Sequence, residues 1–419
     1  MSGLIVEQYQ ALPYPARNPA DEVNRLVEGS PSRLLEINHY IFSGARDFRG
    51  TFRALIAGGG TGDAAIMLAQ HLRDRHCPAE LVYLDLSTTS RSIAESRAAR
   101  RGLNNINFIT GSLLDLPDLV TGGFDYIDCC GVLHHLDDPA AGLRTLAAAL
   151  LPGGGMGVMV YGTYGRTGVY HAQAMLRLLA GQDNDRAKTV PARLDLARRL
   201  LQQLPSTNWL RRNPAIADHV HGGDAGLYDL LLHSTDRAYD VPGFVELVTG
   251  CGLEIATFID PWRYDPASYI KDPVLLSQLA DLTPMERAGF AELLAGNLKC
   301  HVAYLVPQGM AAASVARPTC STAIPVLRPD ALSWANRIGA RESLTLTIDG
   351  LKTSIALPPF SAPIMALIDG QRSIAAIHQE MARASEEWSD WIKFKPVFDK
   401  VYTMFNSLNV LFLEQPRNT

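Results

Sequence analysis

The chain has 419 residues, of which 47% are apolar and 19% are charged, and its formal net charge is −5. A chain of this size and composition can fold into two or three domains with well-buried cores. The negative charge argues against a nucleic-acid-binding protein, which usually presents a basic face. The first residues show no basic stretch followed by an apolar one, so no signal peptide is predicted. No apolar run reaches the ~18 residues that a membrane-spanning helix needs.

The six cysteines are scattered along the chain and form no CxxC pair with the spacing of metal ligands. Cys129 and Cys130 are neighbours in a predicted strand. We therefore expect reduced thiols, no metal site and a cytoplasmic protein.

Residues 1–50 are predicted to be a lead-in that caps the domain after it. This stretch contains an aromatic and proline-rich segment, Tyr9–Pro15, and a helical segment around Asn24–Phe42.

Strands and helices are predicted to alternate over residues 51–161. The predicted strands are short and apolar: Arg53–Ala57, Leu81–Asp85, Ile106–Ile109, Phe124–Cys129 and Gly155–Tyr161. The predicted helices lie between them: Asp63–Arg75, Ser87–Arg101 and Ala140–Leu151. This order is typical of a parallel sheet that is covered by helices on both faces.

Residues 162–250 are predicted to be a helical insertion that acts as a lid, with helices at Tyr170–Leu179 and Arg193–Leu204. Two further strands are predicted at Leu253–Ile259 and His301–Val306, with a helix at Pro284–Leu298 between them. A stretch containing alanine and proline, residues 308–325, is predicted to be a linker.

Residues 325–419 are predicted to form a small α+β domain. Its predicted elements are a hairpin of Leu344–Ile348 and Thr353–Leu357, helices at Ser373–Ala384 and Lys395–Leu408, and a strand at Val410–Leu413. Asp349 and Gly350 are the expected hairpin turn. This order resembles a winged-helix module, but its charges are balanced, which favours peptide docking or dimerisation over DNA contact.

An apolar strand runs into a glycine-rich turn at Gly58–Gly62 and then into a predicted helix. Glycine at positions 58, 60 and 62 removes the Cβ atoms that would keep a ligand away from the backbone. The amides at the start of the helix face whatever lies over the turn. The spacing of Gly60, Gly62 and Ala65 also fits the dinucleotide-binding fingerprint, so the turn alone leaves the ligand open.

Asp85 ends the next predicted strand, 23 positions beyond Gly62. Parallel neighbouring strands bring this carboxylate to the same sheet edge as the glycine turn, where it can accept hydrogen bonds from two ribose hydroxyls. Either S-adenosylmethionine (SAM) or a nicotinamide dinucleotide would satisfy this pair of features.

Later motifs decide between the two. A loop at Thr110–Pro117, the LHHL sequence at Leu133–Leu136 and a Leu-Pro-Gly-Gly turn at Leu151–Gly154 follow in order. With the glycine turn and Asp85, this set resembles the class I SAM-dependent methyltransferases over about residues 50–310. The resemblance implies SAM as cofactor and a Rossmann-like seven-stranded α/β sheet whose last strand, here His301–Val306, runs antiparallel.

The resemblance assigns SAM-binding roles by position. Gly58, Gly60 and Gly62 would line the methionine portion. Asp85 would hold the ribose, and Leu86 would pack on the adenine.

Ser112 and Leu113 would flank the adenine edge, and Cys130 would lie near the carboxylate and sulfonium end of SAM. Two positions depart from the family pattern. Ala57 stands where an acidic residue often opens the glycine motif, and Ser112 replaces the usual acid of the adenine loop.

The sequence leaves more than one class of methyl acceptor open. Methyl transfer requires a nucleophile held in line with an activated carbon, and an oxygen acceptor benefits from a general base. His134 and His135 lie at the carboxyl end of the fourth strand, and His134 is the candidate base. A packing or helix-entry role is an equally good reading of this histidine pair. No Asn-Pro-Pro-Tyr-type tetrapeptide follows the strand, which argues against methylation of amide or base nitrogens.

Shorter motifs narrow the resemblance. The segments Pro13–Pro15, Tyr161–Tyr170, Leu231–Tyr239 and Glu292–Asn297 are similar to those of bacterial protein lysine methyltransferases, which carry an extra regulatory domain. A lysine nucleophile must lose a proton from a group with a pKa of ~10.4. Desolvation among tyrosines would lower that pKa. The candidate tyrosines are Tyr14, Tyr161, Tyr164 and Tyr239.

The favoured hypothesis is a SAM-dependent enzyme that methylates a protein lysine, with His134, Tyr14 and Tyr161 as candidate catalytic residues. The alternatives are a small-molecule O- or C-methyltransferase with His134 as base, a nicotinamide-dependent oxidoreductase, and a SAM-binding scaffold without turnover. Expected partners are a protein or small-molecule acceptor and a second copy bound through the C-terminal domain, without nucleic acid or a membrane span.

Overall fold

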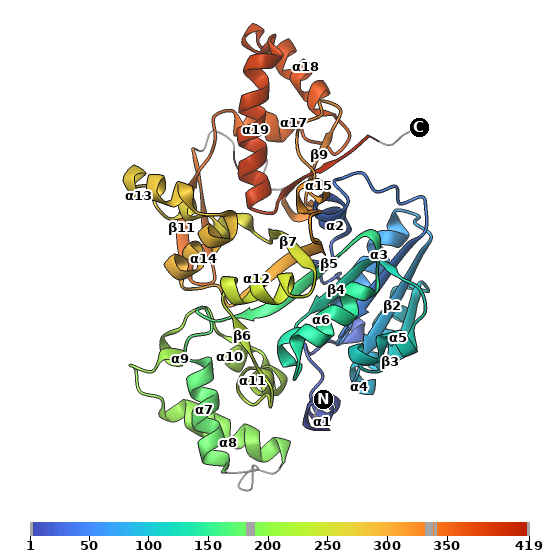
Figure 1. Ribbon diagram of the computed structural model, residues 1–419, viewed down its shortest axis with the longest axis vertical. Coiled ribbons are helices and arrows are strands. Elements are labelled where there is room, and N and C mark those ends of the chain that lie inside the picture. Colours follow the sequence, from blue (N-terminus) through green and yellow to red (C-terminus); the bar gives the residue numbers. More distant parts are fainter. Residues whose placement is uncertain (1–2, 182–188, 332–337, 339–341, 417–419) are drawn as a thin grey trace.

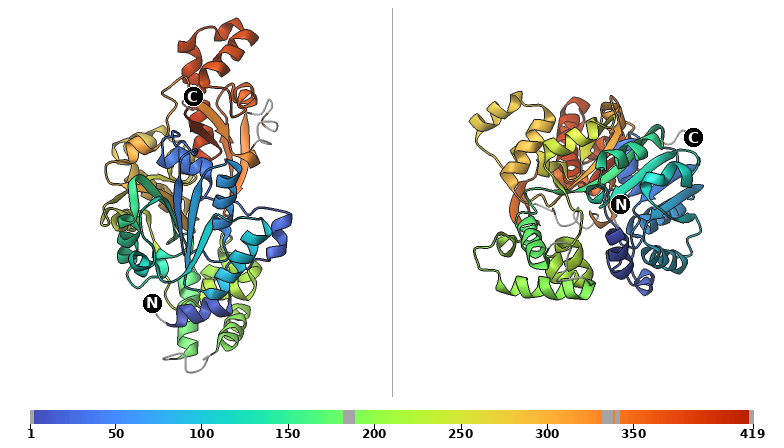
Figure 2. Two further views of the ribbon diagram at one scale, coloured as in Figure 1. Left: turned by 90° about the vertical axis from the view of Figure 1, so that its right-hand side faces the viewer. Right: turned by 60° about the horizontal axis from the view of Figure 1, so that its bottom comes forward.

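A computed structural model describes residues 3–181, 189–331, 338 and 342–416. A central sheet occupies the middle of the molecule, the helical insertion lies at one end and the C-terminal elements lie at the other (Figure 1). The same three-part arrangement is visible from the side in Figure 2.

Within the described residues the central sheet has eight strands: seven follow the order β3-β2-β1-β4-β5-β8-β7, and the short strand β6 pairs with β5 beside this path. Its strands are β1 Phe52–Ala57, β2 Ala79–Asp85, β3 Ile106–Thr110, β4 Phe124–Cys130, β5 Leu150–Gly162, β6 Ala238–Tyr239, β7 Leu253–Phe258 and β8 Cys300–Pro307. β8 runs antiparallel to both of its neighbours. The predicted seven-stranded α/β fold with an antiparallel last strand is therefore confirmed.

Both faces of the sheet are buried, which is why its strands are almost continuously apolar. One face packs against helices α6 Pro139–Ala148, α12 Val241–Thr249 and α14 Pro284–Ala295. The other face packs against helices α2 Leu34–Ile41, α3 Asp63–Asp74 and α4 Thr88–Arg100. The predicted helices of this region agree with these bounds to within a few residues.

The lead-in departs from its prediction. The expected helix around Asn24–Phe42 is wrong in its first half: α2 begins only at Leu34. Pro31 explains the late start, because proline lacks an N–H and disfavours helical backbone in the residue before it. The structure also has a helix that was not predicted, α1 Gly3–Ala11, and a 3-10 turn, η1 Pro19–Val23.

The insertion leaves the sheet after β5 and returns through β6. Its helices are α7 Val169–Ala180, α8 Val190–Gln203, α9 Trp209–Arg212, α10 Asp218–His221 and α11 Gly223–Leu231. They share an apolar core of their own, against which Leu12 of the lead-in also packs. Both views of the ribbon show α1 beside α11 (Figures 1 and 2). The predicted helices of the insertion are confirmed.

The C-terminal elements enclose another apolar core. They are β9 Ile324–Leu327, the hairpin of β10 Ser343–Ile348 and β11 Leu351–Ala356, helices α17 Ser361–Leu367, α18 Ile374–Ala384 and α19 Trp391–Ser407, and β12 Leu411–Glu414. The hairpin turns at Asp349 and Gly350, both with positive φ, as predicted.

The predicted linker differs from the structure in two places. A short helix, α15 Ala311–Ser314, lies within the predicted linker. The last residues of the predicted linker belong to β9, which pairs antiparallel with β12. Phe412 of β12 also packs in the sheet core beside Tyr40 of α2. The C-terminal elements are therefore joined to the sheet by buried contacts. The likeness to a winged-helix module stays a prediction.

A buried ion-pair network fastens the lead-in to the helices that follow the glycine turn. Arg97 of α4 is fully buried, and its Nε donates to Glu22 at 2.6 Å. Its Nη1 donates to Asp63 of α3 at 2.7 Å and to the carbonyl of Thr61 at 2.8 Å. Arg17 also pairs with Asp63, at 2.6 Å. The network holds residues 15–23 against the start of α3.

Replacement of Arg97 by methionine is expected to lower the free energy of unfolding by about 2 to 3 kcal/mol, because the buried carboxylate of Glu22 loses one of its two arginine partners and keeps only Arg101. Urea unfolding followed by tryptophan fluorescence measures the change. The matched control is Arg199→Met, which removes the exposed pair of Arg199 with Asp195 on α8 and should cost less than about 0.5 kcal/mol. Equal effects of the two substitutions would show that the buried network does not hold the lead-in.

Candidate active site

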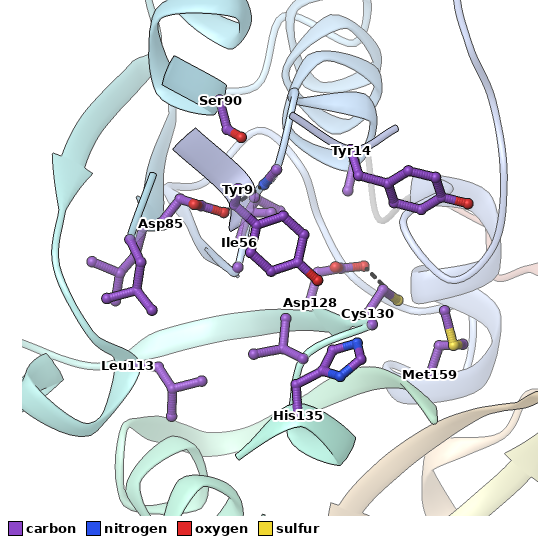
Figure 3. A pocket seen from close by; sticks show the side chains of 18 of the residues that line it. Tyr9, Tyr14, Ile56, Asp85, Ser90, Leu113, Asp128, Cys130, His135 and Met159 are labelled. Atoms are coloured by element: carbon purple, nitrogen blue, oxygen red, sulfur yellow. Dashed lines mark hydrogen bonds between the residues drawn. The ribbon is translucent and has the colours of Figure 1, made fainter. Parts of the chain in front are cut away.

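A cavity of about 370 Å³ opens at the carboxyl ends of the parallel strands, in the size range of small-molecule sites. Three parts of the chain line it: the sheet edge, the lead-in through Tyr9 and Tyr14, and the insertion through Asp229 of α11. Asp85 and Leu113 lie toward one end of the cavity in Figure 3, and Cys130 and Met159 lie toward the other.

The glycine turn forms one wall of the cavity, as predicted for Gly58 and Gly60. Gly58 has a φ of +80°, and a Cβ on it would lie 2.1 Å from Cγ2 of Val132. Gly60 has a φ of +51°, and a Cβ on it would lie 3.0 Å from the carbonyl oxygen of Tyr14. The turn therefore requires glycine at both positions, and the lead-in lies directly over it.

Gly62 does not line the cavity. It precedes helix α3, and a Cβ on it would lie 2.8 Å from Cβ of Ala94 in helix α4. The predicted ligand role of Gly62 is therefore replaced by a packing role, because the turn directs this residue toward the neighbouring helix.

Asp85 lines the cavity together with Leu86 and Leu113. The Asp85 carboxylate accepts hydrogen bonds from the N–H of Gly60 at 2.7 Å and from the N–H of Ser87 at 2.8 Å. Burial raises the pKa of Asp85. The same carboxylate thus orders the glycine turn and faces the space where the ribose is expected.

Ser112 is the second predicted residue that does not line the cavity. Its hydroxyl accepts from the N–H of Leu114 at 3.1 Å and so caps the 3-10 turn Leu113–Asp115. Its neighbours Gly111 and Leu113 line the cavity. The adenine side of the site is consequently apolar at this loop.

Cys130 lines the cavity, as predicted, and introduces a carboxylate that the sequence reasoning missed. The Cys130 thiol donates to Oδ2 of Asp128 at 3.6 Å (Figure 3). The Ser32 hydroxyl donates to the same oxygen at 2.6 Å. Burial raises the pKa of the Cys130 thiol well above its ordinary value, so the thiol stays protonated. Burial raises the pKa of Asp128 to about 6.

The sequence placed the missing acid of the glycine motif at Ala57, and the structure corrects this position by one residue. Ile56 lines the cavity, whereas Ala57 points into the opposite face of the sheet and packs in its core. Side chains alternate along a strand, so a shift of one residue moves a side chain from one face to the other. Ile56 is the cavity-facing residue at the end of β1.

A further part of the cavity wall is built around Asp229. The hydroxyl of Tyr9 donates to one carboxylate oxygen at 3.1 Å, and the hydroxyl of Tyr161 donates to the other at 3.0 Å. Burial raises the pKa of Asp229, and it raises the pKa of both tyrosines well above 10. Both phenols therefore stay neutral donors to the carboxylate.

Two groups pack against the ring of Tyr161. The guanidinium of Arg166 lies 3.6 Å from the ring centroid, and the ring of His134 lies 3.9 Å from it. Arg166 is itself fixed by a buried ion pair with Asp236 at 3.0 Å.

Tyr14 lines the cavity beside the glycine turn. Burial, and after it the charge of Asp229, raises the pKa of Tyr14 to about 12. A phenol with this pKa does not act as a base near neutral pH. Tyr164 and Tyr239, which were named as further candidates, do not line the cavity.

His134 does not reach the cavity, which corrects its prediction as the base. The side chain is fully buried, neither ring nitrogen has a hydrogen-bond partner, and burial lowers its pKa well below 6.5. The 3-10 turn Leu133–His135 instead directs His135 to the cavity wall. Nδ1 of His135 lies 2.8 Å from the carbonyl of Thr235, and its ring stacks on His233 at 3.7 Å.

Within the described residues, no cluster of three or more histidine, cysteine or carboxylate side chains could hold a metal ion. In the same ranges, none of the helices is both long enough and apolar enough to cross a bilayer.

Comparisons with known proteins identify the domain that contains this cavity. Residues 55–156 match a family model described as a methyltransferase domain. A 245-residue stretch is 33% identical to an uncharacterized protein of Synechococcus sp., covering 58% of this chain and 57% of that protein. The chain therefore spans little more than half the length of that relative. A shorter stretch of 114 residues is 32% identical to the tRNA 5-carboxymethoxyuridine methyltransferase of Escherichia coli, covering 27% of this chain and 41% of that enzyme.

Solved structures give the same fold over most of the chain. The structure of PKMT2 from Rickettsia typhi matches with a TM-score of 0.61 at 14% identity, covering 89% of this chain and 72% of that one. The same protein in complex with AdoHcy matches with a TM-score of 0.60 at 15% identity, covering 98% and 76%. The strand order, the glycine turn with Asp85, and the domain match agree: the chain contains a class I SAM-dependent methyltransferase domain.

Proposed function

We propose that this protein transfers a methyl group from SAM to the side-chain amine of a lysine in a protein substrate. The observation that carries the acceptor is Asp229, a buried carboxylate in the cavity wall that is held by two tyrosine hydroxyls. The fold likeness to PKMT2 of Rickettsia typhi and the lysine-methyltransferase-like motifs of the sequence are in line with this choice.

The residues at the sheet edge fit SAM. Asp85 offers a carboxylate to the ribose hydroxyls, Leu86 and Leu113 offer apolar surface to the adenine, and Gly58 and Gly60 allow close approach of the backbone. When bound, SAM supplies a methyl group that is already activated on a sulfonium. The protein therefore has to position the acceptor, exclude water and accept one proton.

The part of the cavity around Asp229 suits an ammonium group. Its walls contain the rings of Tyr9, Tyr14 and Tyr161, and aromatic faces attract cations. The carboxylate of Asp229 adds an opposite charge. A lysine entering here would leave water, and burial lowers the pKa of an amine.

Burial of the acceptor site also explains how the lysine amine could give its proton to Asp229. Because burial raises the pKa of Asp229 and lowers that of the lysine, the two values approach each other. The carboxylate can then accept the proton from Nζ, and the neutral amine keeps its lone pair for the methyl carbon. The hydroxyls of Tyr9 and Tyr161 hold the carboxylate oxygens in place throughout.

A second function is favoured by one specific observation. His135 lines the cavity, and burial lowers its pKa, so it is neutral near pH 7 and can accept a proton. A small-molecule O-methyltransferase would use His135 in the role that the sequence suggested for His134. The acceptor class, and dimerisation through the C-terminal elements, both stay predictions.

Replacement of Asp85 by alanine is expected to weaken SAM binding by roughly 10- to 100-fold, because charge-assisted hydrogen bonds to the ribose are lost. Isothermal titration calorimetry with SAM measures the dissociation constant. NAD serves as the comparison ligand and should show no binding to the unaltered protein. An unchanged affinity for SAM in the variant would contradict the ribose assignment.

Replacement of Asp229 by asparagine is expected to lower kcat by about 10²- to 10⁴-fold, because the amide cannot take the proton from the amine. The affinity for SAM should stay unchanged, since the proposal gives Asp229 a contact with the acceptor amine and none with SAM. The matched control is Asp224→Asn on the same helix, where Asp224 is exposed and pairs with Arg198. A full kcat in Asp229→Asn would exclude this carboxylate as the proton acceptor.

Incubation of the purified protein with methyl-labelled SAM and a cell lysate is expected to leave the label in protein. Acid hydrolysis followed by amino-acid analysis should then recover it as methyl-lysine. Asp229→Asn protein is the control for background transfer. Label found only in small molecules would favour the O-methyltransferase alternative, and label in RNA would contradict both proposals.

A further inference from the structure

Four carboxylates line the cavity: Asp63, Asp85, Asp128 and Asp229. For three of these carboxylates, the bonding partners indicate a role. Asp63 is paired with Arg17 and Arg97, Asp85 receives the amides of the glycine turn and Ser87, and Asp229 is held by two tyrosines. Asp128 has no such assignment in the steps described so far.

Asp128 lies on the floor of the cavity between its two ends (Figure 3). It is 2% exposed, and the groups that donate to its Oδ2 are the neutral Ser32 hydroxyl and the neutral Cys130 thiol. Neither donor carries a charge. A buried carboxylate without an opposite charge is costly, which points to a cationic group that belongs to the ligand.

The sheet register shows which position Asp128 replaces. Ile56 of β1 and Asp128 of β4 are direct partners in the parallel ladder, and both line the cavity. The end of β1, where an acid often stands in this family, is therefore apolar on its cavity side. The carboxylate of Asp128 instead lies one strand away, on β4, at the same level along the strands and on the same face of the sheet.

We propose that Asp128 is the counter-ion of the ammonium group in the amino-acid portion of SAM, in place of an acid at the end of β1. The inference rests on the proposed cofactor and assigns one of its charged groups to a residue of this chain. The ammonium is the cationic centre that remains when the sulfonium is directed toward the acceptor.

The surroundings of Asp128 suit this role. With a pKa of about 6, raised by burial, the carboxylate is largely ionised at neutral pH, and a neighbouring ammonium would stabilise the ionised form further. Cys130 stays a neutral thiol because its pKa is raised. The hydroxyl of Ser32 fixes the direction of the carboxylate from outside the sheet. Ser32 is thus a positioning residue for the cofactor, contributed by the lead-in.

The experiment compares two ligands with two variants by calorimetry. The ligands are SAM and methylthioadenosine, which keeps the adenosine and the sulfur but lacks the amino-acid portion. For Asp128→Asn, affinity for SAM should fall by about 10- to 100-fold, while affinity for methylthioadenosine stays within about twofold. For Asp85→Asn, affinity for both ligands should fall, because both contain the ribose. Unchanged methylthioadenosine binding also shows that the Asp128 variant is folded.

Asp125→Asn is the matched control on the same strand. Asp125 pairs with Arg46 and does not line the cavity, so both affinities should be retained. Equal losses for the two ligands in Asp128→Asn, or no loss for SAM, would overturn the inference while leaving the cofactor intact. Absence of SAM binding to the unaltered protein would instead overturn the proposed function. If Asp128→Asn does not fold, Ser32→Ala replaces it, with the same selective loss expected in smaller degree.

Discussion

A carboxylate that is removed from water needs donors or an opposite charge, and four carboxylates at one edge of this sheet are partly or fully removed from water. The local structure follows from how each of them is matched. The amides of Gly60 and Ser87 turn toward Asp85 and thereby set the conformation of the glycine turn. Asp63 is matched by arginines, which tie the lead-in to helices α3 and α4. Asp128 and Asp229 are matched by neutral hydroxyl and thiol donors, which leaves them able to act on a cationic ligand or acceptor.

The cavity is closed by segments that are far apart in the chain. Tyr9 and Asp229 are separated by 220 positions and share a hydrogen bond across the cavity. Thr61 donates to the carbonyl of Pro15 at 2.7 Å, which holds the lead-in over the glycine turn. The insertion and the lead-in thus form one cover over the sheet edge. A cover of this kind would exclude water from the amine of the proposed lysine acceptor, and it brings aromatic rings to the cavity wall.

Two of the differences between expectation and structure come down to a single residue. The sequence predicted His134 as the base, whereas His135 faces the cavity. It also predicted that Ala57 stands in the place of an acid, whereas Ile56 is the residue at this strand end that faces the cavity. In both cases the element was placed correctly and the direction of the side chain was not. Neighbouring residues on a strand or a tight turn point to opposite sides, and here both sides of the sheet are apolar and buried. The pattern of apolar residues therefore contains no signal that separates the cavity side from the core side.

The lead-in was mispredicted for a different reason. Its apolar residues fit a longer helix than α2, and the break at Pro31 was overlooked although proline is a visible signal. Ser32, which follows it, is placed against Asp128 only by the packing of α2 on the sheet. No spacing rule connects a serine in the lead-in with an aspartate 96 positions later in β4.

The sequence by itself determined the alternation of strands and helices and the glycine turn with its Asp85 partner, because these follow from local backbone chemistry and spacing. The antiparallel last strand was implied by the resemblance to the class I methyltransferases. Asp85, Leu86, Leu113 and Cys130, which the resemblance named, all line the cavity, since the carboxyl ends of parallel strands meet at one edge. Only the tertiary structure decided which carboxylates complete the site. Asp128 depends on the pairing of β4 with β1, and Asp229 depends on the return of the insertion to α1. Long-range contacts of this kind are set by the packing of whole elements, which the pattern within any one segment does not contain.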